Sequence, residues 1–436
     1  MIINIVYSLG RPQTHKVDRS KVEKLDQDKI MTHKFSFPTE IIKEGRIKVT
    51  ISKLKLYAKG LSEYIPSKAP VFYNPLMEMS RDVSVLALRV YQKRTGKKLR
   101  ICDPLAGCGI RGLRFAREVK QIDNVTLNDV NLEAVKMAQI NIEMNELSNL
   151  VTVKNYDANI FLNKNSFTNK RYDVIDIDPY GSPTHFLDSA VRALKNGGLI
   201  ALTATDMAVL CGVKNLVCIR KYFGKSLRTE YCHELAIRLL INALVFSAGR
   251  HNFGVNVLFS HHTGHYVRVY AQIWRGKLKA NASIKKLGYI LHCFNCLNRK
   301  WGFNIPRLIE GKCDVCGKKM RVAGPLWLGK LVDGTFCTEM IAELKREENM
   351  KTGRMLSKLL HMVEMEADTL PTYFVIDKVC KKIKSNVPTK QKVIEKILEE
   401  GYNAVSTHFN PIGIKTNASI RIVEKGIRNA LKKYTI

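Results

Sequence analysis

The sequence predicts an α/β fold, in which a doubly wound, mostly parallel sheet ends in an antiparallel hairpin and is followed by a smaller α+β region. Three observations predict it. Apolar strand-like runs alternate with helical patterns between residues 45 and 275, as in a chain of βαβ units. Each of these runs ends in an aspartate. Two later apolar runs are close enough in sequence to pair as a hairpin, which adds an antiparallel strand to the sheet.

The expected elements follow one another in chain order. Parallel strands are expected at residues 99–103, 125–129, 151–157, 172–178 and 199–206, with helices at 111–119, 131–145 and 184–194. The hairpin is expected at 255–260 and 266–274, around a turn that contains Gly264. Because parallel strands expose their carboxyl ends at one edge of a sheet, where open α/β folds bind ligands, the terminal aspartates are expected to meet there.

Changes in composition divide the chain into four parts. Residues 1–44 are basic and polar and predict an N-terminal extension, and residues 45–275 hold the α/β pattern. Residues 276–365 carry a cysteine-bearing segment and linker helices. Residues 366–436 form a basic C-terminal domain whose order of helix, turn and helix is compatible with a winged-helix-like unit that binds nucleic acid. A helical packing domain is the alternative for this last part.

The composition favours a nucleic-acid-binding protein. Lys and Arg number 71 against 39 Asp and Glu, which gives a formal net charge of +32 and favours a polyanionic partner. A generally basic proteome or a membrane-surface protein is the alternative. We expect no membrane span and no signal peptide. The 11 cysteines, an odd number, suit the reduced thiols of a cytoplasmic protein, and a monomer suffices for the inferences that follow.

The loop that follows the first strand, from Asp103 to Gly109, has the form of a nucleotide-binding turn. Gly107 and Gly109 permit a tight turn and the close approach of a ligand to the backbone. Asp129, at the end of the second strand, is placed to hold a ribose diol. The loop lacks the third glycine of the dinucleotide fingerprint, and no phosphate-binding lysine follows it. S-adenosylmethionine, which has no phosphate, therefore fits better than NAD.

Four further residues complete the expected cofactor site. Asp157 and Ala158 follow the third strand, where an adenine amino group is expected. Arg81 and Arg111 are near these elements in sequence, and an arginine can bind a carboxylate through two parallel hydrogen bonds. A surface charge is the alternative for either arginine.

The most informative segment is Asp176-Ile177-Asp178-Pro179-Tyr180-Gly181, at the end of the apolar run 172–177. A carboxylate there can accept a hydrogen bond from an exocyclic amino group and take up its proton. Proline lacks the N–H donor and leaves its carbonyl as an acceptor, and the tyrosine ring offers a base a stacking surface. The segment predicts chemistry on the amino group of a nucleobase, with an ordinary Asp-Pro turn as the alternative.

The cysteine pairs Cys293/Cys296 and Cys313/Cys316 predict a zinc site. Each pair has the C-x₂-C spacing, which places two thiolates on one tetrahedral Zn²⁺. With four protein thiolates the ion has no open position, so the zinc is expected to be structural. The other cysteines, Cys211 and Cys232 among them, have no partner spacing and are expected to be buried or idle thiols.

Taken together, these residues resemble the tRNA guanine-26 N2-dimethyltransferase family, archaeal type with a four-cysteine zinc site. The match runs from about residue 44 to 331. It is carried by Ala69-Pro70-Val71-Phe72-Tyr73-Asn74-Pro75, Ser80-Arg81-Asp82, Gly109-Ile110-Arg111-Gly112, Asn128-Asp129, Asp178-Pro179-Tyr180-Gly181-Ser182-Pro183, Thr203-Ala204-Thr205-Asp206, Leu210-Cys211-Gly212, Glu230-Tyr231-Cys232-His233-Glu234 and Gly324-Pro325-Leu326-Trp327-Leu328-Gly329.

The resemblance implies a class I, Rossmann-like methyltransferase that uses S-adenosylmethionine on tRNA. It implies that Asp178 is the catalytic carboxylate and that Phe72 and Tyr180 sandwich the guanine. The implied cofactor contacts are Arg81, Arg111, Asp129, Asp157 and Ala158. The chain departs from the family in its 103–108 loop, where the family often has Ala-Leu-Ser-Ala-Thr, and at Tyr180, where the family commonly has phenylalanine.

Two other functions fit part of the pattern. An adenine N6-methyltransferase would use the same carboxylate, proline and ring, but such enzymes usually have a second proline where this chain has Tyr180. A tRNA-binding module without catalysis would tolerate the loss of catalytic groups, yet every expected catalytic and cofactor position holds a competent residue.

Overall fold

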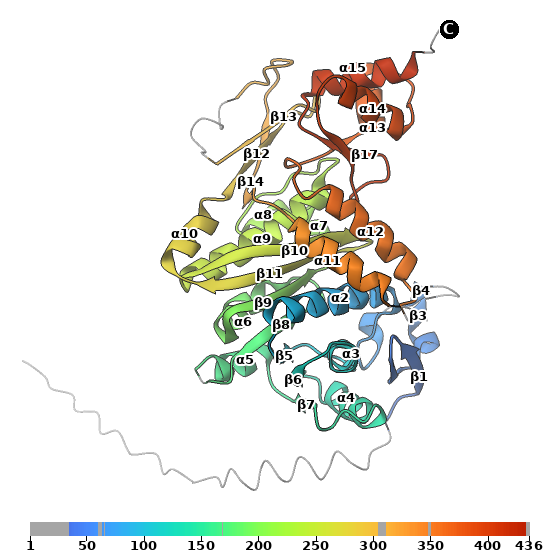
Figure 1. Ribbon diagram of the computed structural model, residues 1–436, viewed down its shortest axis with the longest axis vertical. Coiled ribbons are helices and arrows are strands. Elements are labelled where there is room, and N and C mark those ends of the chain that lie inside the picture. The colour runs from blue at the N-terminus through green and yellow to red at the C-terminus, as the bar shows by residue number, and fades with distance from the viewer. Residues whose placement is uncertain are drawn as a thin grey trace, which may run out of the picture.

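The computed structural model describes residues 35–59, 63–64, 66–167, 169–303, 311–347 and 350–432 (Figure 1). Its centre is a seven-stranded sheet with the order β10-β11-β9-β8-β5-β6-β7. The strands are β5 (Leu99–Asp103), β6 (Ile122–Asn128), β7 (Val151–Lys154), β8 (Tyr172–Ile177), β9 (Leu194–Ala204), β10 (Phe253–Thr263) and β11 (Tyr266–Arg275). Strands β5 to β9 pair in parallel, whereas β11 is antiparallel to both β9 and β10. The predicted fold class, with its terminal hairpin, is confirmed.

Apolar residues at alternate positions of the strands pack into two separate hydrophobic cores, one on each face of the sheet. On β9, Leu199 and Ala201 join one core while Ile200 and Leu202 join the other, as the two-residue period of a strand requires. The first core is covered by α2 (Glu78–Thr95), α3 (Ile110–Glu118) and α4 (Leu132–Met144), and the second by α5 (Ala158–Ser166), α6 (Leu187–Ala193) and α9 (Cys232–Arg250).

The order of the strands opens a crevice above β5. The chain runs from β5 through β6 to β7 in one direction, then returns to β8 on the other side of β5. The loops after β5 and β8 therefore diverge, and a ligand can enter between them. Short elements surround this edge: η4 (Pro75–Met77), η5 (Pro183–Phe186), α7 (Met207–Leu210) and α8 (Asn215–Tyr222).

The prediction of an N-terminal extension at residues 1–44 falls partly on residues that the structure describes. Residues 39–44 form β1 (Thr39–Glu44), which pairs antiparallel with β2 (Ile47–Ser52). Glu44 is only 1% exposed because Arg81 and Arg114 surround it, and this tertiary pairing has no signature in the local sequence. Residues 1–34 lie outside the described residues. A short η2 (Leu54–Tyr57), β3 (Ala58–Lys59), β4 (Glu63–Tyr64) and η3 (Pro66–Lys68) follow.

The cysteine-bearing segment forms a second sheet. After α10 (Lys277–Ile284), β12 (Leu287–His292) lies between β13 (Arg299–Gly302) and β14 (Arg321–Trp327). Helices α11 (Gly334–Lys345) and α12 (Gly353–Met365) then return to the first core of the large sheet. The last elements have their own core and are β15 (Phe374–Val375), α13 (Ile376–Ile383), α14 (Lys390–Glu399), β16 (Ala404–Ser406), β17 (Gly413–Thr416) and α15 (Ile420–Leu431).

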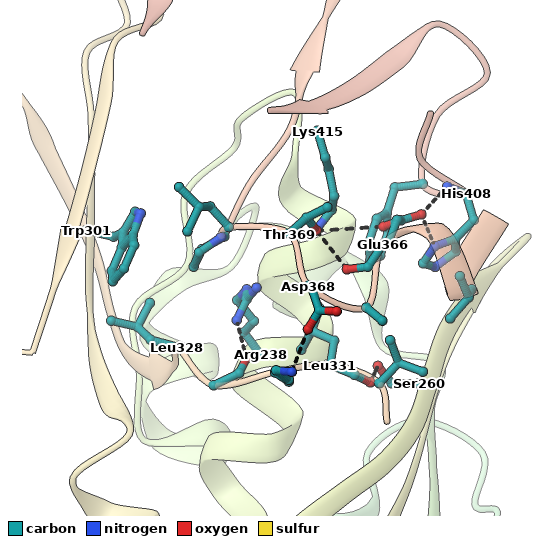
Figure 2. Close-up of a pocket in the computed structure, with 18 residues that line it drawn as sticks. Arg238, Ser260, Trp301, Leu328, Leu331, Glu366, Asp368, Thr369, His408 and Lys415 are labelled. Atoms are coloured by element: carbon teal, nitrogen blue, oxygen red, sulfur yellow. Dashed lines mark hydrogen bonds and ion pairs between the residues drawn. The ribbon is translucent and has the colours of Figure 1, made fainter. Parts of the chain in front are cut away.

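Buried charges join the C-terminal elements to α9 around the cavity shown in Figure 2. Lys415 Nζ on β17 lies 3.0 Å from Glu234 Oε2 on α9 and 3.7 Å from Glu366 Oε2. Arg238 Nη2 lies 2.7 Å from Glu234 Oε1, and His408 Nδ1 lies 2.8 Å from Glu366 Oε1. Burial alone would raise the pKa of Glu234, but Lys415 and Arg238 together lower it to about 2.

Helix α9 is long and apolar enough to cross a membrane by length and composition alone, which the sequence did not lead us to expect. In the structure, 78% of its most apolar window is buried inside the protein. The helix packs against β10, β11 and β14 and against α6, α7 and α8. Its apolar character is thus explained by its place between the large sheet and the cysteine-bearing segment.

Candidate active site and metal centre

A cavity of about 250 Å³ opens at the carboxyl ends of β5, β6 and β8. It brings together residues that are far apart in sequence. Of the residues singled out in the sequence, it is lined by Phe72, Arg81, Asp103, Gly107, Arg111, Asp129, Asp178, Pro179 and Tyr180. The two remaining candidates for the cofactor site, Asp157 and Ala158, are not part of its lining.

Asp129 shapes the loop after β5. Its Oδ2 accepts a hydrogen bond from the Gly107 N–H at 2.8 Å, and its Oδ1 accepts one from the Asn131 N–H at 2.9 Å. Gly107 has a φ of +54°, and a Cβ there would come within 3.0 Å of the Phe72 carbonyl oxygen. Only glycine fits this close crossing of two backbones. Burial raises the pKa of Asp129.

Asp157 and Ala158 begin helix α5 beside the cavity. The Asp157 Oδ1 accepts hydrogen bonds from the N–H groups of Asn159 at 2.9 Å and Ile160 at 3.0 Å, so it caps the helix. Ala158 is the first residue of α5 and is buried. Helix capping thus occupies one oxygen of the carboxylate that the sequence assigned to a cofactor contact.

Arg81 is held by Glu44, a residue that the sequence had placed in the extension. Its Nε and Nη2 each lie 2.6 Å from a Glu44 carboxylate oxygen, and Nη2 also donates to the Asn74 carbonyl at 3.2 Å. Tyr73 donates its hydroxyl to Glu44 at 3.2 Å. Arg81 lines the cavity, and its hydrogen bonds to Glu44 and to the Asn74 carbonyl fix its orientation.

A buried polar network lies beneath Asp178. Arg111 forms an ion pair with Asp178, donates to Ser84 Oγ at 2.7 Å and lies 3.8 Å from Asp176 Oδ2. Arg268, fully buried on β11, pairs with the same Asp176 oxygen. The guanidinium of Arg111 pairs with the carboxylate of Asp178. The sequence analysis had instead assigned Arg111 to a contact with the cofactor.

The two arginines decide the charge of Asp178. Burial alone would raise the pKa of this carboxyl group, but the positive charges of Arg111 and Arg268 hold it below its usual value. Asp178 is therefore an anion throughout the neutral range. Its side chain is still 21% exposed, so it can reach a ligand in the cavity.

Asp103 behaves in the opposite way. Burial and the neighbouring charges of Asp176 and Asp178 raise the pKa of Asp103 to about 8, against the opposing effect of Arg111. Its Oδ1 is buried without a hydrogen-bond partner among the described residues. Asp103 is therefore protonated at neutral pH and carries a donor or acceptor that is free for a ligand.

The raised pKa of Asp103 predicts a change of stability with pH. An acid that holds its proton more tightly in the folded state stabilises the fold at low pH, and this contribution is lost as the pH rises from about 4 through about 8. Each unit of difference in pKa corresponds to ~1.4 kcal/mol. We expect the free energy of unfolding to fall across this window in the wild type relative to Asp103→Asn, measured by urea denaturation at several pH values. Parallel curves for the two proteins would contradict the assignment.

Two aromatic rings flank the mouth of the cavity. The centroids of Phe72 and Tyr180 lie 6.5 Å apart with an interplanar angle of 62°, and the rings are 43% and 80% exposed. The turn that carries Tyr180 is fixed from below, because the Gly181 N–H donates to Thr205 Oγ1 and the Thr205 N–H donates to the Gly181 carbonyl, both at 2.8 Å. The exposed rings are free to receive a planar group beside Asp178.

The four paired cysteines meet at the tip of the second sheet. Their sulfur atoms all lie within 4.8 Å of one another, with Cys293 3.5 Å from Cys316 and Cys296 3.5 Å from Cys313. The two pairs form similar turns, because the N–H groups of Leu297 and Gly317 donate to the carbonyls of the first cysteine in each pair. Four thiols in this arrangement suit one tetrahedral zinc ion.

Comparison with known proteins identifies the family. Residues 45–428 match the family described as N2,N2-dimethylguanosine tRNA methyltransferase. The chain belongs to this family. The resemblance read from the sequence motifs is thereby confirmed.

Individual relatives support the family assignment over most of the chain. The tRNA (guanine(26)-N(2))-dimethyltransferase of Methanosphaera stadtmanae is 40% identical over 379 residues, which cover 87% of this chain and 94% of the relative. An Aquifex aeolicus relative, named tRNA (guanine(26)-N(2)/guanine(27)-N(2))-dimethyltransferase, is 33% identical and covers 88% and 95%. The structure of Trm1 from Pyrococcus horikoshii with S-adenosyl-L-methionine has a TM-score of 0.77 at 29% identity and covers 89% of this chain and 99% of that one.

In this member of the N2,N2-dimethylguanosine tRNA methyltransferase family, three site residues had no role predicted from the sequence: Glu44, Asp176 and Arg268. For two of them a signal was present. Asp176 is a carboxylate inside an apolar strand, and Arg268 is a charge in the middle of an apolar hairpin strand. A buried charge needs a partner of opposite sign, so the two could have been paired. Glu44 had no such signal.

Proposed function

We propose that this chain is an S-adenosylmethionine-dependent tRNA (guanine-26-N2)-dimethyltransferase, which produces N2-methylguanosine and then N2,N2-dimethylguanosine. The match to the family and the names of the relatives support the activity. The observation that carries the proposal is the position of Asp178, ionised and flanked by exposed rings, in the same cavity as the Gly107 loop and Asp129.

The residues of the cavity fit S-adenosylmethionine. We propose that Asp129 holds the ribose hydroxyls and that the backbone at Gly107, which has no room for a side chain, lies against the cofactor. The unpartnered Asp103 Oδ1 offers a further polar contact. Glu44 and Asn74 engage Nε and Nη2 of Arg81, so Nη1 is the atom that we propose for the cofactor's carboxylate.

The adenine end is proposed at Asp157 and Ala158. Asp157 uses Oδ1 to cap α5, so we assign its second oxygen to the adenine amino group and the Ala158 backbone to the ring. For Arg111 we propose a different role from the one that the family resemblance implies. Its guanidinium orients Asp178 and keeps it ionised.

We propose that Asp178 activates the exocyclic amino group of guanine, which is the nucleophile. An aryl amine is a poor nucleophile because its lone pair is delocalised into the purine, and S-adenosylmethionine supplies the electrophilic methyl group. We propose that Asp178 accepts one N–H of the guanine amino group and that the Pro179 carbonyl accepts the other, which favours the pyramidal nitrogen that attack requires. The nitrogen becomes cationic and strongly acidic as its new N–C bond forms, so even a carboxylate of lowered pKa can take its proton.

Phe72 and Tyr180 receive the base. Guanine-26 lies inside the stacked tRNA and must leave the stack to reach a buried carboxylate. The two exposed rings offer it a replacement stacking surface, and the apolar wall of Phe72 leaves room for the first methyl group while the amine turns its remaining hydrogen toward Asp178.

Replacement of Tyr180 tests the stacking role. We expect Tyr180→Ala to lower kcat/KM for tRNA about 10- to 100-fold, because stacking on an aromatic side chain contributes about 1–3 kcal/mol per base. Tyr180→Phe keeps the ring and is the matched control, with an activity close to that of the wild type. Steady-state methylation kinetics measure both. An equal loss in the two variants would show that the hydroxyl, and not the ring, carries the effect.

A nucleoside analysis tests the proposed function directly. A tRNA transcript and its guanine-26-to-adenine variant are incubated with the protein and S-adenosylmethionine, and the nucleosides are read by mass spectrometry. We expect N2,N2-dimethylguanosine from the first transcript alone. N2-methylguanosine as the final product would limit the chain to one transfer, and N6-methyladenosine would replace the proposal with adenine methylation.

We further propose that the four-cysteine group holds a structural Zn²⁺. All four sulfur atoms are supplied by the protein and lie within 4.8 Å of one another, which leaves no open position for catalysis. We expect Cys296→Ser to lower the zinc content by about one ion per chain and to destabilise the second sheet. Elemental analysis of the full chain measures the loss. An unchanged zinc content would contradict this site.

The remaining parts of the chain are proposed to bind tRNA. We propose a division at residues 45, 276 and 366 into the catalytic sheet, the cysteine-bearing segment and a basic C-terminal domain. Helices α13 and α14 of this last domain carry clustered lysines. Lysine side chains bind the phosphates of a nucleic acid whatever its nucleotide sequence. We propose a cytoplasmic monomer, in which this domain holds the tRNA while the cavity receives the base.

A further inference from the structure

Two motifs with no role in the proposed reaction meet in the structure. Cys211 follows α7, while Cys232 and His233 begin α9. One ligand atom from each of the three residues lies within 4.8 Å of the other two. Cys211 and Cys232, which the sequence predicted to be buried or idle thiols without partner spacing, thus lie close together in the fold.

Gly212 explains why sequence spacing concealed this cluster. It has a φ of +83°, and a Cβ there would lie 2.6 Å from the Leu227 carbonyl carbon and 2.7 Å from the Arg228 nitrogen. The chain therefore turns tightly after Cys211 and passes directly against the segment that leads into α9. Two cysteines twenty-one positions apart are brought together by a backbone crossing that only glycine allows.

We propose that Cys211, Cys232 and His233 bind a second Zn²⁺ ion, with three protein ligands and one open position. Thiolate sulfur and neutral imidazole nitrogen are both preferred zinc ligands, and a set of two cysteines and one histidine suits a tetrahedral site whose fourth ligand is water. All three side chains are partly exposed, so an ion can enter. The site is separate from the four-cysteine group, whose ligands come from the second sheet.

The surroundings of His233 match those of a metal ligand. Its ring stacks on His262 with a centroid distance of 3.9 Å and an interplanar angle of 12°, and it is in hydrogen-bonding contact with the backbone of Phe409. A ligating histidine commonly uses its other nitrogen for a backbone group, which fixes the ring orientation. Cys232 and His233 also lie in the first turn of the 19-residue α9, where the helix dipole favours a thiolate.

The ion would stabilise the segment that supports the active-site turn, because it would link α7 to α9. Thr205, shortly before α7, exchanges two hydrogen bonds of 2.8 Å with Gly181, the residue after Tyr180. A metal that links Cys211 to Cys232 would join the end of α7 to the start of α9. The site therefore has a positioning role for the Asp178-Pro179-Tyr180 turn, and its three ligands are not among the residues that line the cavity.

A cobalt titration tests the proposal on the full chain. The reduced protein is stripped of metal with a chelator and titrated with Co²⁺, whose thiolate charge-transfer bands report each sulfur site. We expect saturation at about two equivalents in the wild type, one for each cysteine group. Cys232→Ser is expected to lower this by about one equivalent, whereas Cys218→Ser, which removes a buried thiol outside both groups, should leave it unchanged.

Two further variants make the outcome decisive. His233→Gln is expected to weaken the second site and shift its bands, because a nitrogen ligand is lost. Cys296→Ser should remove the other site only, so a failure of the four-cysteine proposal is distinguishable from a failure of this one. Identical titrations of the wild type, Cys211→Ser and Cys232→Ser would overturn the proposal. A Cys211–Cys232 disulfide in the protein as isolated, found by mass spectrometry without reductant, would also overturn it.

Discussion

Asp178→Asn is expected to lower kcat for methyl transfer about 1,000-fold, within the range of a lost general base. The amide keeps the shape of the side chain but loses the negative charge that accepts the amino hydrogen and the proton. Arg111 remains beside Asp176 at 3.8 Å, so the network beneath the site keeps a counter-ion. Single-turnover methylation measures the loss of rate.

Binding measurements separate a chemical effect from a structural one. We expect Asp178→Asn to bind S-adenosylmethionine and tRNA within a few-fold of the wild type, since the proposed binding contacts lie elsewhere in the cavity. Asp188→Asn, which alters a half-exposed carboxylate on α6, is the matched control and should retain full activity. Turnover of Asp178→Asn at a rate near that of the wild type would remove Asp178 from the mechanism.

Arg114→Met is expected to lower the free energy of unfolding by about 3–5 kcal/mol, the usual cost of removing one partner from a buried ion pair. Arg114 is fully buried and lies 3.2 Å from Glu44, 2.6 Å from Asp82 and 2.8 Å from Glu118. Methionine has a similar volume, so the loss reflects charge and not a cavity. Among the residues that the structure describes, the three buried carboxylates would keep one ion-pair partner, Arg81 on Glu44.

An exposed arginine provides the comparison. Arg46 is 48% exposed and lies 3.1 Å from the buried side chain of Glu347, which has a second partner in Arg89 at 2.8 Å. An ion pair whose cation is open to solvent contributes about 0–1 kcal/mol, and Glu347 keeps a counter-ion when Arg46 is replaced. We expect Arg46→Met to change the free energy of unfolding by less than about 1 kcal/mol. Urea denaturation followed by circular dichroism measures both variants. Equal effects of the two substitutions would show that the buried network around Arg114 contributes little to stability.

The strands of the large sheet were predictable because their signal is local. The run at 99–103 coincides with β5, and the two closely spaced apolar runs at 255–260 and 266–274 lie within β10 and β11. The gathering of Asp103, Asp129 and Asp178 at one edge followed from parallel topology alone. All three line the same cavity.

The contacts of the arginines were not predictable in this way. Whether Arg111 faces a cofactor or Asp178 depends on a hairpin strand more than 150 residues later, which delivers Arg268 to Asp176. Asp157 is a different case, since an aspartate directly before a helix is a common N-cap and its capping role was foreseeable. Long-range pairing of charges and the crossing at Gly212 required the folded structure.

The burial of Glu44, on β1, has a consequence for how the sequences of relatives can vary. Glu44 lies at the end of β1, which pairs with β2. Its two cationic partners, Arg81 and Arg114, lie on α2 and α3. A lineage that discarded β1 and β2 would leave Arg81 without an ion-pair partner among the described residues, whereas Arg114 would keep Asp82 and Glu118. Positions 44 and 81 are therefore expected to vary together among relatives, and a relative without an acid at position 44 should also lack an arginine at position 81.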